Sequence, residues 1–157
     1  MMPLLTQGSG SARLQQPSEP LTILLVEDDP MQRALFSTCL TEQGFAVLEA
    51  SHGTDALRVC RKHRGPIHLL LADVMLPKWG GLALPTKDMA APDLNGIELA
   101  HQVEALVRQI RVILMSGHPK ETIKRQGAVK AGTAFLHKPF DTEYLVQRVH
   151  EVLGHRT

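Results

Sequence analysis

The sequence predicts an α/β sandwich in which five parallel strands lie between two layers of helices. Five apolar runs have the length of strands, and most are continuous rather than alternating, as in strands buried on both faces. Helical patterns separate these runs, which favours a parallel sheet with right-handed crossovers. The length of 157 residues suits one domain with a substantial core.

The first strand is expected at 22–26 (TILLV), with a helix directly after it. Asp29 is a natural N-cap, and Pro30 suits the first helical position, where an N–H would have no partner. The residues expected on the buried face of this helix are Met31, Leu35, Phe36, Cys39 and Leu40.

The second strand is expected at 45–48 (FAVL) and the third at 67–72 (IHLLLA). Between them a helix carries Ala56, Val59 and Cys60, and Gly65-Pro66 stops it. A third helix follows Asn95-Gly96, because Asn95 and Glu98 have the spacing of a capping box. Its apolar residues are Leu99, Ala100, Val103, Leu106 and Val107.

The fourth and fifth strands are expected at 111–115 (RVILM) and 133–136 (TAFL). A weakly patterned helix is predicted between them, over about 119–131, with Ile123, Ala128 and Ala131 as its apolar points. The last helix starts from Asp141, and its apolar residues are Leu145, Val149, Val152 and Leu153.

Two segments do not belong to the predicted alternation of strands and helices. Residues 1–20 are rich in Gly, Ser, Gln and Pro and are interpreted as a flexible N-terminal tail or linker before a domain at 21–154. Residues 78–94 form an insertion, because a βα loop normally has about two to six residues. Whether it is a passive surface excursion, or a lid or docking element, stays open.

Composition excludes several classes of protein. A formal net charge of +1 argues against direct nucleic-acid binding, which needs a clear basic excess on one face. No run approaches the roughly 18 apolar residues of a membrane span, and no signal peptide is visible. We therefore expect a cytoplasmic protein without a membrane partner.

Polar residues follow the apolar runs where strands should end. Glu27 and Asp28 follow the first, Asp73 the third, Ser116 the fourth and Lys138 the fifth. Because ligands of open parallel sheets bind at the carboxyl ends of the strands, we expect these side chains to converge. Three adjacent carboxylates cannot all stay ionised without a cation, and Mg²⁺ suits such a site.

Lysine and serine add functions to this acidic cluster. Lys138 would place a positive point charge at the same edge, and Ser116 would add a hydroxyl donor. A carboxylate, a divalent metal, an amine and a hydroxyl together suit a phosphoryl group carried by a carboxylate.

The segments ILLVEDDPMQR, LLLADVMLP, VILMSGHP and FLHKPF resemble the receiver (REC) domain of two-component response regulators. The resemblance spans about residues 21–154, and four motifs in order are far more specific than one. It implies a flavodoxin-like three-layer sandwich with strand order 2-1-3-4-5. The stretch LMSGHPKETIKRQGAVKAGTAFLHKPF looks closest to receivers attached to hybrid sensor histidine kinases.

The resemblance implies a role for each strand-end residue. Asp73 would accept a phosphoryl group from a phosphohistidine. Glu27, Asp28, Asp73 and the Met75 backbone carbonyl would hold Mg²⁺. Lys138 would bind the phosphoryl group.

It also implies how phosphorylation would be transmitted. The peptide bond between Lys138 and Pro139 would be cis. Ser116 and Phe135 would form a switch, in which the hydroxyl moves to the phosphoryl oxygen and the ring follows inward. The surface around the fourth helix, fifth strand and fifth helix would then change.

The expected partners are a sensor histidine kinase or histidine phosphotransfer protein, and a downstream protein. We expect a regulatory domain rather than an enzyme, limited to Mg²⁺-dependent phosphorylation and dephosphorylation of itself. The chain ends soon after the fifth helix, so it is expected to be either a single-domain regulator or a piece of a longer protein such as a hybrid kinase. Whether phosphorylation produces a homodimer stays open.

Three other functions compete with this interpretation. A phosphohydrolase with an aspartyl nucleophile often has a second Asp two residues later, where this chain has Met75. A flavin-binding module needs a Ser/Thr/Gly-rich phosphate loop after the first strand, where this chain has EDDPMQR. A degenerate receiver that acts only as a docking module stays open because of the 78–94 insertion.

Overall fold

The computed structural model describes residues 18–76, 94–125 and 127–154. The predicted N-terminal tail and the predicted insertion therefore lie outside the described residues, apart from residues 18–20 and 94. The strands are β1 (Thr22–Val26), β2 (Ala46–Ala50), β3 (Leu69–Asp73), β4 (Arg111–Ser116) and β5 (Ala134–His137). The helices are α1 (Pro30–Glu42), α2 (Gly53–Lys62), α3 (Gly96–Leu106), α4 (Lys120–Lys124) and α5 (Thr142–Leu153).

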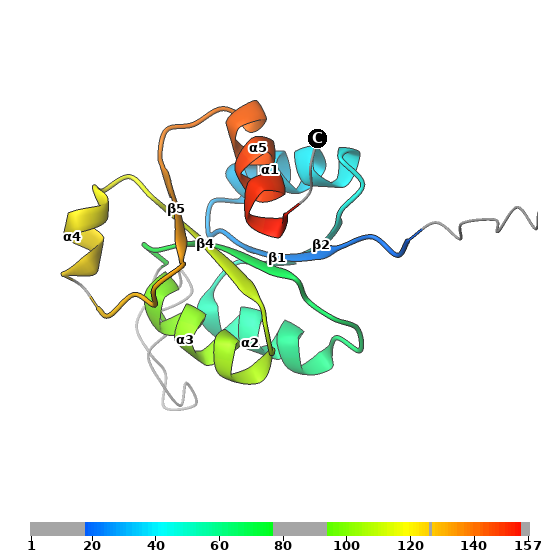
Figure 1. Ribbon diagram of the computed structural model, residues 1–157, viewed down its shortest axis with the longest axis horizontal. Coiled ribbons are helices and arrows are strands. Elements are labelled where there is room, and N and C mark those ends of the chain that lie inside the picture. The colour runs from blue at the N-terminus through cyan, green and yellow to red at the C-terminus, as the bar shows by residue number, and fades with distance from the viewer. Residues whose placement is uncertain (1–17, 77–93, 126, 155–157) are drawn as a thin grey trace, which may run out of the picture.

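The five strands form one parallel sheet in the order β2-β1-β3-β4-β5. Helices α1 and α5 cover one face of the sheet, and α2 and α3 cover the other (Figure 1). The predicted sandwich, its strand order and its five helices are thus confirmed. In the described part of the chain, no helix is both long and apolar enough to cross a membrane.

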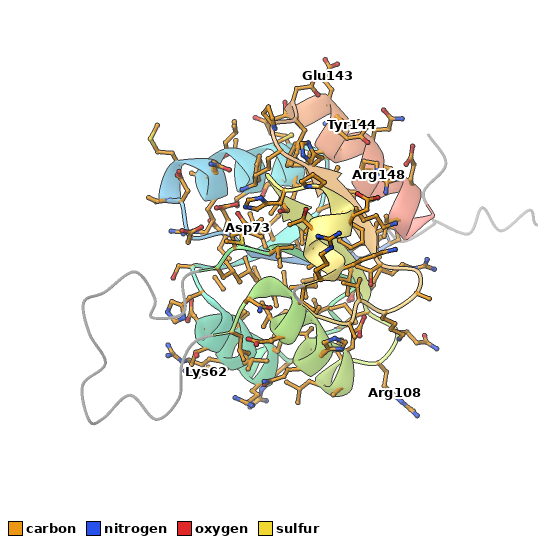
Figure 2. The ribbon with its side chains drawn as sticks, turned by 90° about the vertical axis from the view of Figure 1, so that its left-hand side faces the viewer. Lys62, Asp73, Arg108, Glu143, Tyr144 and Arg148 are labelled. Atoms are coloured by element: carbon orange, nitrogen blue, oxygen red, sulfur yellow. The ribbon has the colours of Figure 1, made fainter. Side chains whose placement is uncertain are left out.

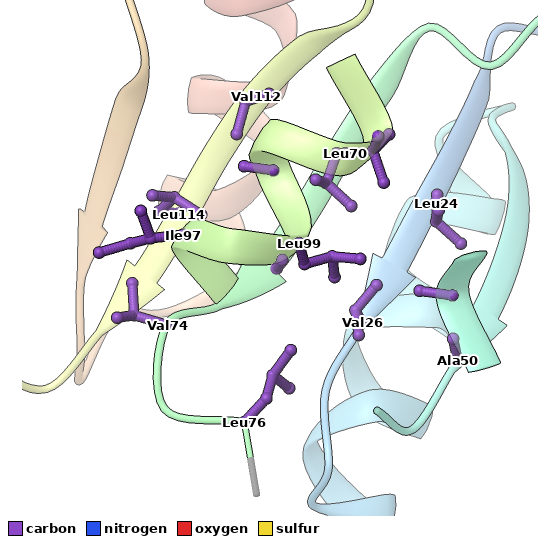
Figure 3. Close-up of a cluster of buried hydrophobic side chains, with 14 of the residues drawn as sticks. Leu24, Val26, Ala50, Leu70, Val74, Leu76, Ile97, Leu99, Val112 and Leu114 are labelled. Atoms are coloured by element: carbon purple, nitrogen blue, oxygen red, sulfur yellow. The ribbon is translucent and has the colours of Figure 1, made fainter. Parts of the chain in front are cut away.

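The core lies on both faces of the sheet, which explains the continuous apolar runs. Every residue of β1 and β3 is buried, whereas the edge strands β2 and β5 are only partly buried. One cluster packs under α2 and α3 and includes Leu24, Val26, Leu70, Leu99 and Leu114 (Figure 3). The other packs under α1 and α5 and includes Ile23, Leu40, Leu71, Ile113 and Leu145.

Side-chain caps begin α1 and α3 at the positions that the sequence predicted. The Asp29 carboxylate accepts the backbone N–H groups of Met31 and Gln32 at 2.8 and 3.1 Å, and Pro30 is the first residue of α1. Asn95 and Glu98 form the expected reciprocal capping box of α3. These caps fix where each helix starts relative to the strand before it.

The register continues past the strand ends and aligns the residues that follow them. Val26 is paired with Ala72, and the Glu27 N–H donates to the Ala50 carbonyl at 3.1 Å. Beyond β5, the Lys138 N–H donates to the Ser116 carbonyl at 2.8 Å. The backbone therefore holds the predicted site residues at one edge of the sheet.

The fourth helix is much shorter than predicted. The sequence indicated a helix over about 119–131, but α4 covers only Lys120–Lys124. Its first residue follows Pro119, which provides no side-chain cap, and Ala131 lies in a turn that leads to Gly132 at φ 91°. With one buried residue, Ile123, this segment has too few apolar contacts to extend the helix.

Several apolar residues expected in the interior are exposed. The exposed fraction is 82% for Met31, 54% for Leu35 and 49% for Leu106. In α1, burial depends on Phe36 and Leu40, which turn toward the sheet, so the apolar face is narrower than the pattern indicated. Helical spacing alone does not say which of several adjacent apolar residues faces the sheet.

Gly96 allows α3 to start directly against the end of β3. A Cβ atom at this position would lie 2.8 Å from the Val74 Cα and closer still to the Asp73 carbonyl oxygen. Both neighbours are backbone atoms, so they cannot move aside as a flexible side chain would. The close approach of α3 to Asp73 therefore requires a residue without a side chain.

We predict that Gly96→Ala lowers the free energy of unfolding by about 1–3 kcal/mol, because the new methyl group overpacks this contact. Urea unfolding followed by circular dichroism measures the change. Gly117→Ala is the matched control, since a Cβ at Gly117 meets nothing within 4 Å. Equal stability of the two variants would contradict the packing argument.

Candidate functional site

Glu27 is a buried carboxylate at the end of β1. Its side chain is 1% exposed, and its two oxygens accept from different groups. Oε2 accepts from the Lys138 ammonium at 2.9 Å, and Oε1 accepts from the Asp29 backbone N–H at 3.2 Å. The Arg33 guanidinium donates to the Glu27 backbone carbonyl at 2.8 Å, which fixes the turn into α1.

Asp73 ends β3 and lies at the edge of the sheet between the two helical layers (Figure 2). Its Oδ2 accepts from Lys138 Nζ at 2.7 Å, and its Oδ1 accepts from the Met75 N–H at 2.8 Å. The residue is 7% exposed. The carboxylate is therefore held in one orientation at the rim of the sheet.

Asp28 completes a cluster of three carboxylates. One oxygen each from Glu27, Asp28 and Asp73 can be chosen so that all three lie within 4.8 Å of one another. Asp28 is exposed, so the cluster opens to solvent on one side. Hard divalent cations bind such oxygen sets and keep several water ligands, so these residues fit Mg²⁺.

Lys138 supplies the positive charge that the cluster contacts. It follows β5, and its peptide bond to Pro139 is cis. Its ammonium donates to Glu27, Asp73 and the Gln32 side-chain oxygen, at 2.9, 2.7 and 3.0 Å. Burial lowers the pKa of Lys138, but the hydrogen bonds to Asp73 and Glu27 outweigh it, and the net pKa is raised.

The raised pKa of Glu27 indicates that the Lys138 ammonium does not fully offset the negative charge of the three carboxylates. The net pKa is raised from 4.5 to about 7: burial raises it most, the hydrogen bond from Lys138 lowers it, and the charge of Asp73 raises it further. A buried carboxylate that is readily protonated near neutrality lacks compensating positive charge. A divalent cation would supply that charge, which is a second reason why the residues fit a metal.

Ser116 ends β4, and Phe135 lies in β5, the strand that Lys138 follows. Ser116 is 1% exposed, and its hydroxyl oxygen accepts from the His118 N–H at 3.0 Å. Phe135 is partly buried against the core, and the Lys120 ammonium lies 5.1 Å from its ring centroid. The contact between Lys120 and Phe135 links the start of α4 to β5.

The structure brings the predicted side chains of Glu27, Asp28, Asp73 and Lys138 together. Met75 contacts the site through its backbone N–H, and the role of its carbonyl as a metal ligand stays a prediction. Sequence reasoning missed Gln32 and Arg33, in the first turn of α1. Polar residues in that turn, directly after the acidic strand end, were the available signal.

The sequence and the fold of this chain are similar to those of known proteins. A family model described as the response regulator receiver domain matches residues 23–87. Protein PilH of Pseudomonas aeruginosa is 27% identical over 134 residues, which cover 84% of this chain and 97% of PilH. The crystal structure of the receiver domain from the hybrid histidine kinase CckA is 28% identical, with a TM-score of 0.65 over 84% of this chain and 98% of that one.

Other similar proteins are considerably longer than this chain. Sensor kinase CckA of Brucella abortus is 27% identical over 132 residues, which cover 84% of this chain but 12% of the kinase. The probable transcriptional regulatory protein TcrX of Mycobacterium tuberculosis is 25% identical, and the match covers 50% of it. The chain thus spans half or less of the length of these two relatives.

The raised Glu27 pKa predicts a pH-dependent stability in metal-free buffer. Between pH 4.5 and 7 the folded protein holds a proton that the unfolded chain has released, so the free energy of unfolding falls as pH rises. We expect Glu27 to account for a loss of about 1–3 kcal/mol over this range.

Urea unfolding at a series of pH values, with a chelator present, measures this loss. Glu27→Gln should remove the part of the pH dependence of the unfolding free energy that comes from Glu27. Glu42→Gln, at an exposed position of α1, should keep it. If the unfolding free energy of the wild type, Glu27→Gln and Glu42→Gln changed equally with pH, Glu27 would ionise normally.

Proposed function

Because this chain carries a receiver domain of the response-regulator family, we propose that it is a phosphoacceptor module of a two-component phosphorelay. In this proposal Asp73 accepts the phosphoryl group. The observation that carries it is the contact of 2.7 Å between the Asp73 carboxylate and the Lys138 ammonium, beside two further carboxylates.

The proposed reaction is a displacement at phosphorus. An oxygen of Asp73 forms a bond to the phosphorus of a phosphohistidine, the P–N bond breaks, and the electron pair returns to the imidazole. Lys138 stabilises negative charge on the phosphoryl oxygens, and the Met75 N–H orients the carboxylate.

The metal in this proposal is Mg²⁺, held by Glu27, Asp28, Asp73 and the Met75 carbonyl. When bound, it offsets charge on the phosphoryl oxygens and lowers the repulsion between the carboxylates. The support is the chemistry of the donor set and the raised Glu27 pKa.

Phosphorylation would be transmitted through Ser116 and Phe135. The Ser116 hydroxyl would turn to the phosphoryl oxygen, and Phe135 would move inward, with a change around α4, β5 and α5. Two features support this proposal. The Phe135 ring is only partly buried and is covered by Lys120, and α4 is short and has no side-chain cap.

The proposed partners follow from the chemistry of the donor. A sensor histidine kinase or histidine phosphotransfer protein would supply the phosphoryl group, and a downstream protein would read the changed surface. The similarity to a sensor kinase and to a hybrid-kinase receiver supports a place in such a relay. The cytoplasmic location, attachment to a hybrid kinase and a phosphorylation-dependent homodimer stay predictions.

We predict that Mg²⁺ and acetyl phosphate phosphorylate the wild-type protein and that Asp73→Asn abolishes the reaction. Intact-mass spectrometry before and after addition of a chelator measures it. Asp55→Asn, which changes an acid on α2, is the matched control and should react as wild type does. Phosphorylation without Mg²⁺, or in Asp73→Asn, would contradict the proposed site, and no reaction at all would favour a docking module.

A second experiment tests the proposed switch at Ser116. With Mg²⁺ and beryllofluoride, amide NMR signals of α4, β5 and α5 should shift in the wild-type protein. Ser116→Ala should still bind beryllofluoride but lose most of the shift in these elements, and Ser116→Thr should restore it. Full shifts in Ser116→Ala would rule out the hydroxyl as the link.

A further inference from the structure

Gln32 lies in the first turn of α1, outside the set of acids and amine that defines the site. Its side-chain oxygen accepts from Lys138 Nζ at 3.0 Å. An ammonium has three N–H groups, and Glu27 and Asp73 take the other two at 2.9 and 2.7 Å. Gln32 therefore completes the coordination of Lys138, and it is the neutral acceptor of the three.

The position of Gln32 is set by the helix cap and by Lys138. Asp29 caps α1 through the Met31 and Gln32 backbone N–H groups, at 2.8 and 3.1 Å. The Gln32 amide oxygen faces the Lys138 ammonium. A flipped amide would turn its NH₂ group toward that ammonium, where like charges repel, so a single orientation is favoured.

The two carboxylate acceptors change during the proposed reaction, whereas Gln32 does not. Asp73 gives up an anionic oxygen when it forms the bond to phosphorus. Glu27 would share its charge with a bound cation. An amide carries no net charge, so its attraction for the ammonium persists through both events.

Resting on the proposed function, we propose that Gln32 is a positioning residue that holds the Lys138 ammonium beside Asp73 while its two carboxylate partners are engaged. The contact links the helix cap at Asp29 to the amine at the end of β5. Without it, one Lys138 N–H would turn to water and the side chain would gain rotamer freedom.

The direct test is the ¹⁵N–¹H signal of the Lys138 side chain in metal-free protein, assigned by its loss in Lys138→Arg. An ammonium with three protein acceptors exchanges slowly and gives a resolved signal. We expect Gln32→Met, which keeps the length of the side chain but removes the acceptor, to broaden or abolish it. Gln32→Glu, which restores an acceptor oxygen, should bring it back.

The second measurement is the rate of phosphorylation by acetyl phosphate with Mg²⁺. We expect Gln32→Met to lower it about tenfold, the effect of losing one hydrogen bond to a charged group. Gln147→Met is the matched control, because Gln147 makes its side-chain hydrogen bond to Glu151 on α5. It should leave both the signal and the rate unchanged.

The outcomes separate this inference from the function on which it rests. If wild-type protein is not phosphorylated, the proposed function fails, while the Lys138 signal still tests the contact. If Gln32→Met retains both the signal and the rate of Gln147→Met, the positioning role is refuted. Gln32→Ala, which removes the acceptor without new bulk, gives a second test if the Met variant folds poorly.

Discussion

Three carboxylates and one ammonium meet at the carboxyl edge of the sheet, and the chemistry proposed for the domain depends on that crowding. Glu27 is almost fully buried there, so its charge must be offset within the protein or by a ligand. Lys138 offsets part of it, and α1 and α3 both begin at this edge, where their N-termini add partial positive charge. The cluster remains short of positive charge, as the pKa of Glu27 near 7 indicates.

A rigid sheet is what keeps these charges close together. β1, β3 and β4 are packed on both faces, so their ends cannot slide without disturbing two cores. Gly96 lets α3 start against the backbone at Asp73, and the Asp29 cap starts α1 next to Glu27. Core packing and helix capping therefore set the geometry of the site, and its reacting groups lie at the strand ends and directly after them.

Much of this could be predicted from local patterns, because the strands are continuously apolar and the strand ends are polar. The caps at Asp29 and Asn95 could be predicted for the same reason, since capping depends on residues two or three positions apart. The contact of Gln32 with Lys138 could not be predicted in this way, because the two residues are 106 positions apart. The contact depends on how α1 crosses the sheet. Met31 was misassigned because its apolar side chain has helical spacing but points to solvent.

Locating a bound divalent cation tests whether the three carboxylates form a metal site at this edge of the sheet. Titration of ¹⁵N-labelled protein with substoichiometric Mn²⁺ broadens the amide signals nearest the bound ion. We expect the amide signals of residues 27–29 and 73–75 to broaden first and excess Mg²⁺ to restore them. Broadening spread over scattered surface acids, or absent at this edge, would contradict it.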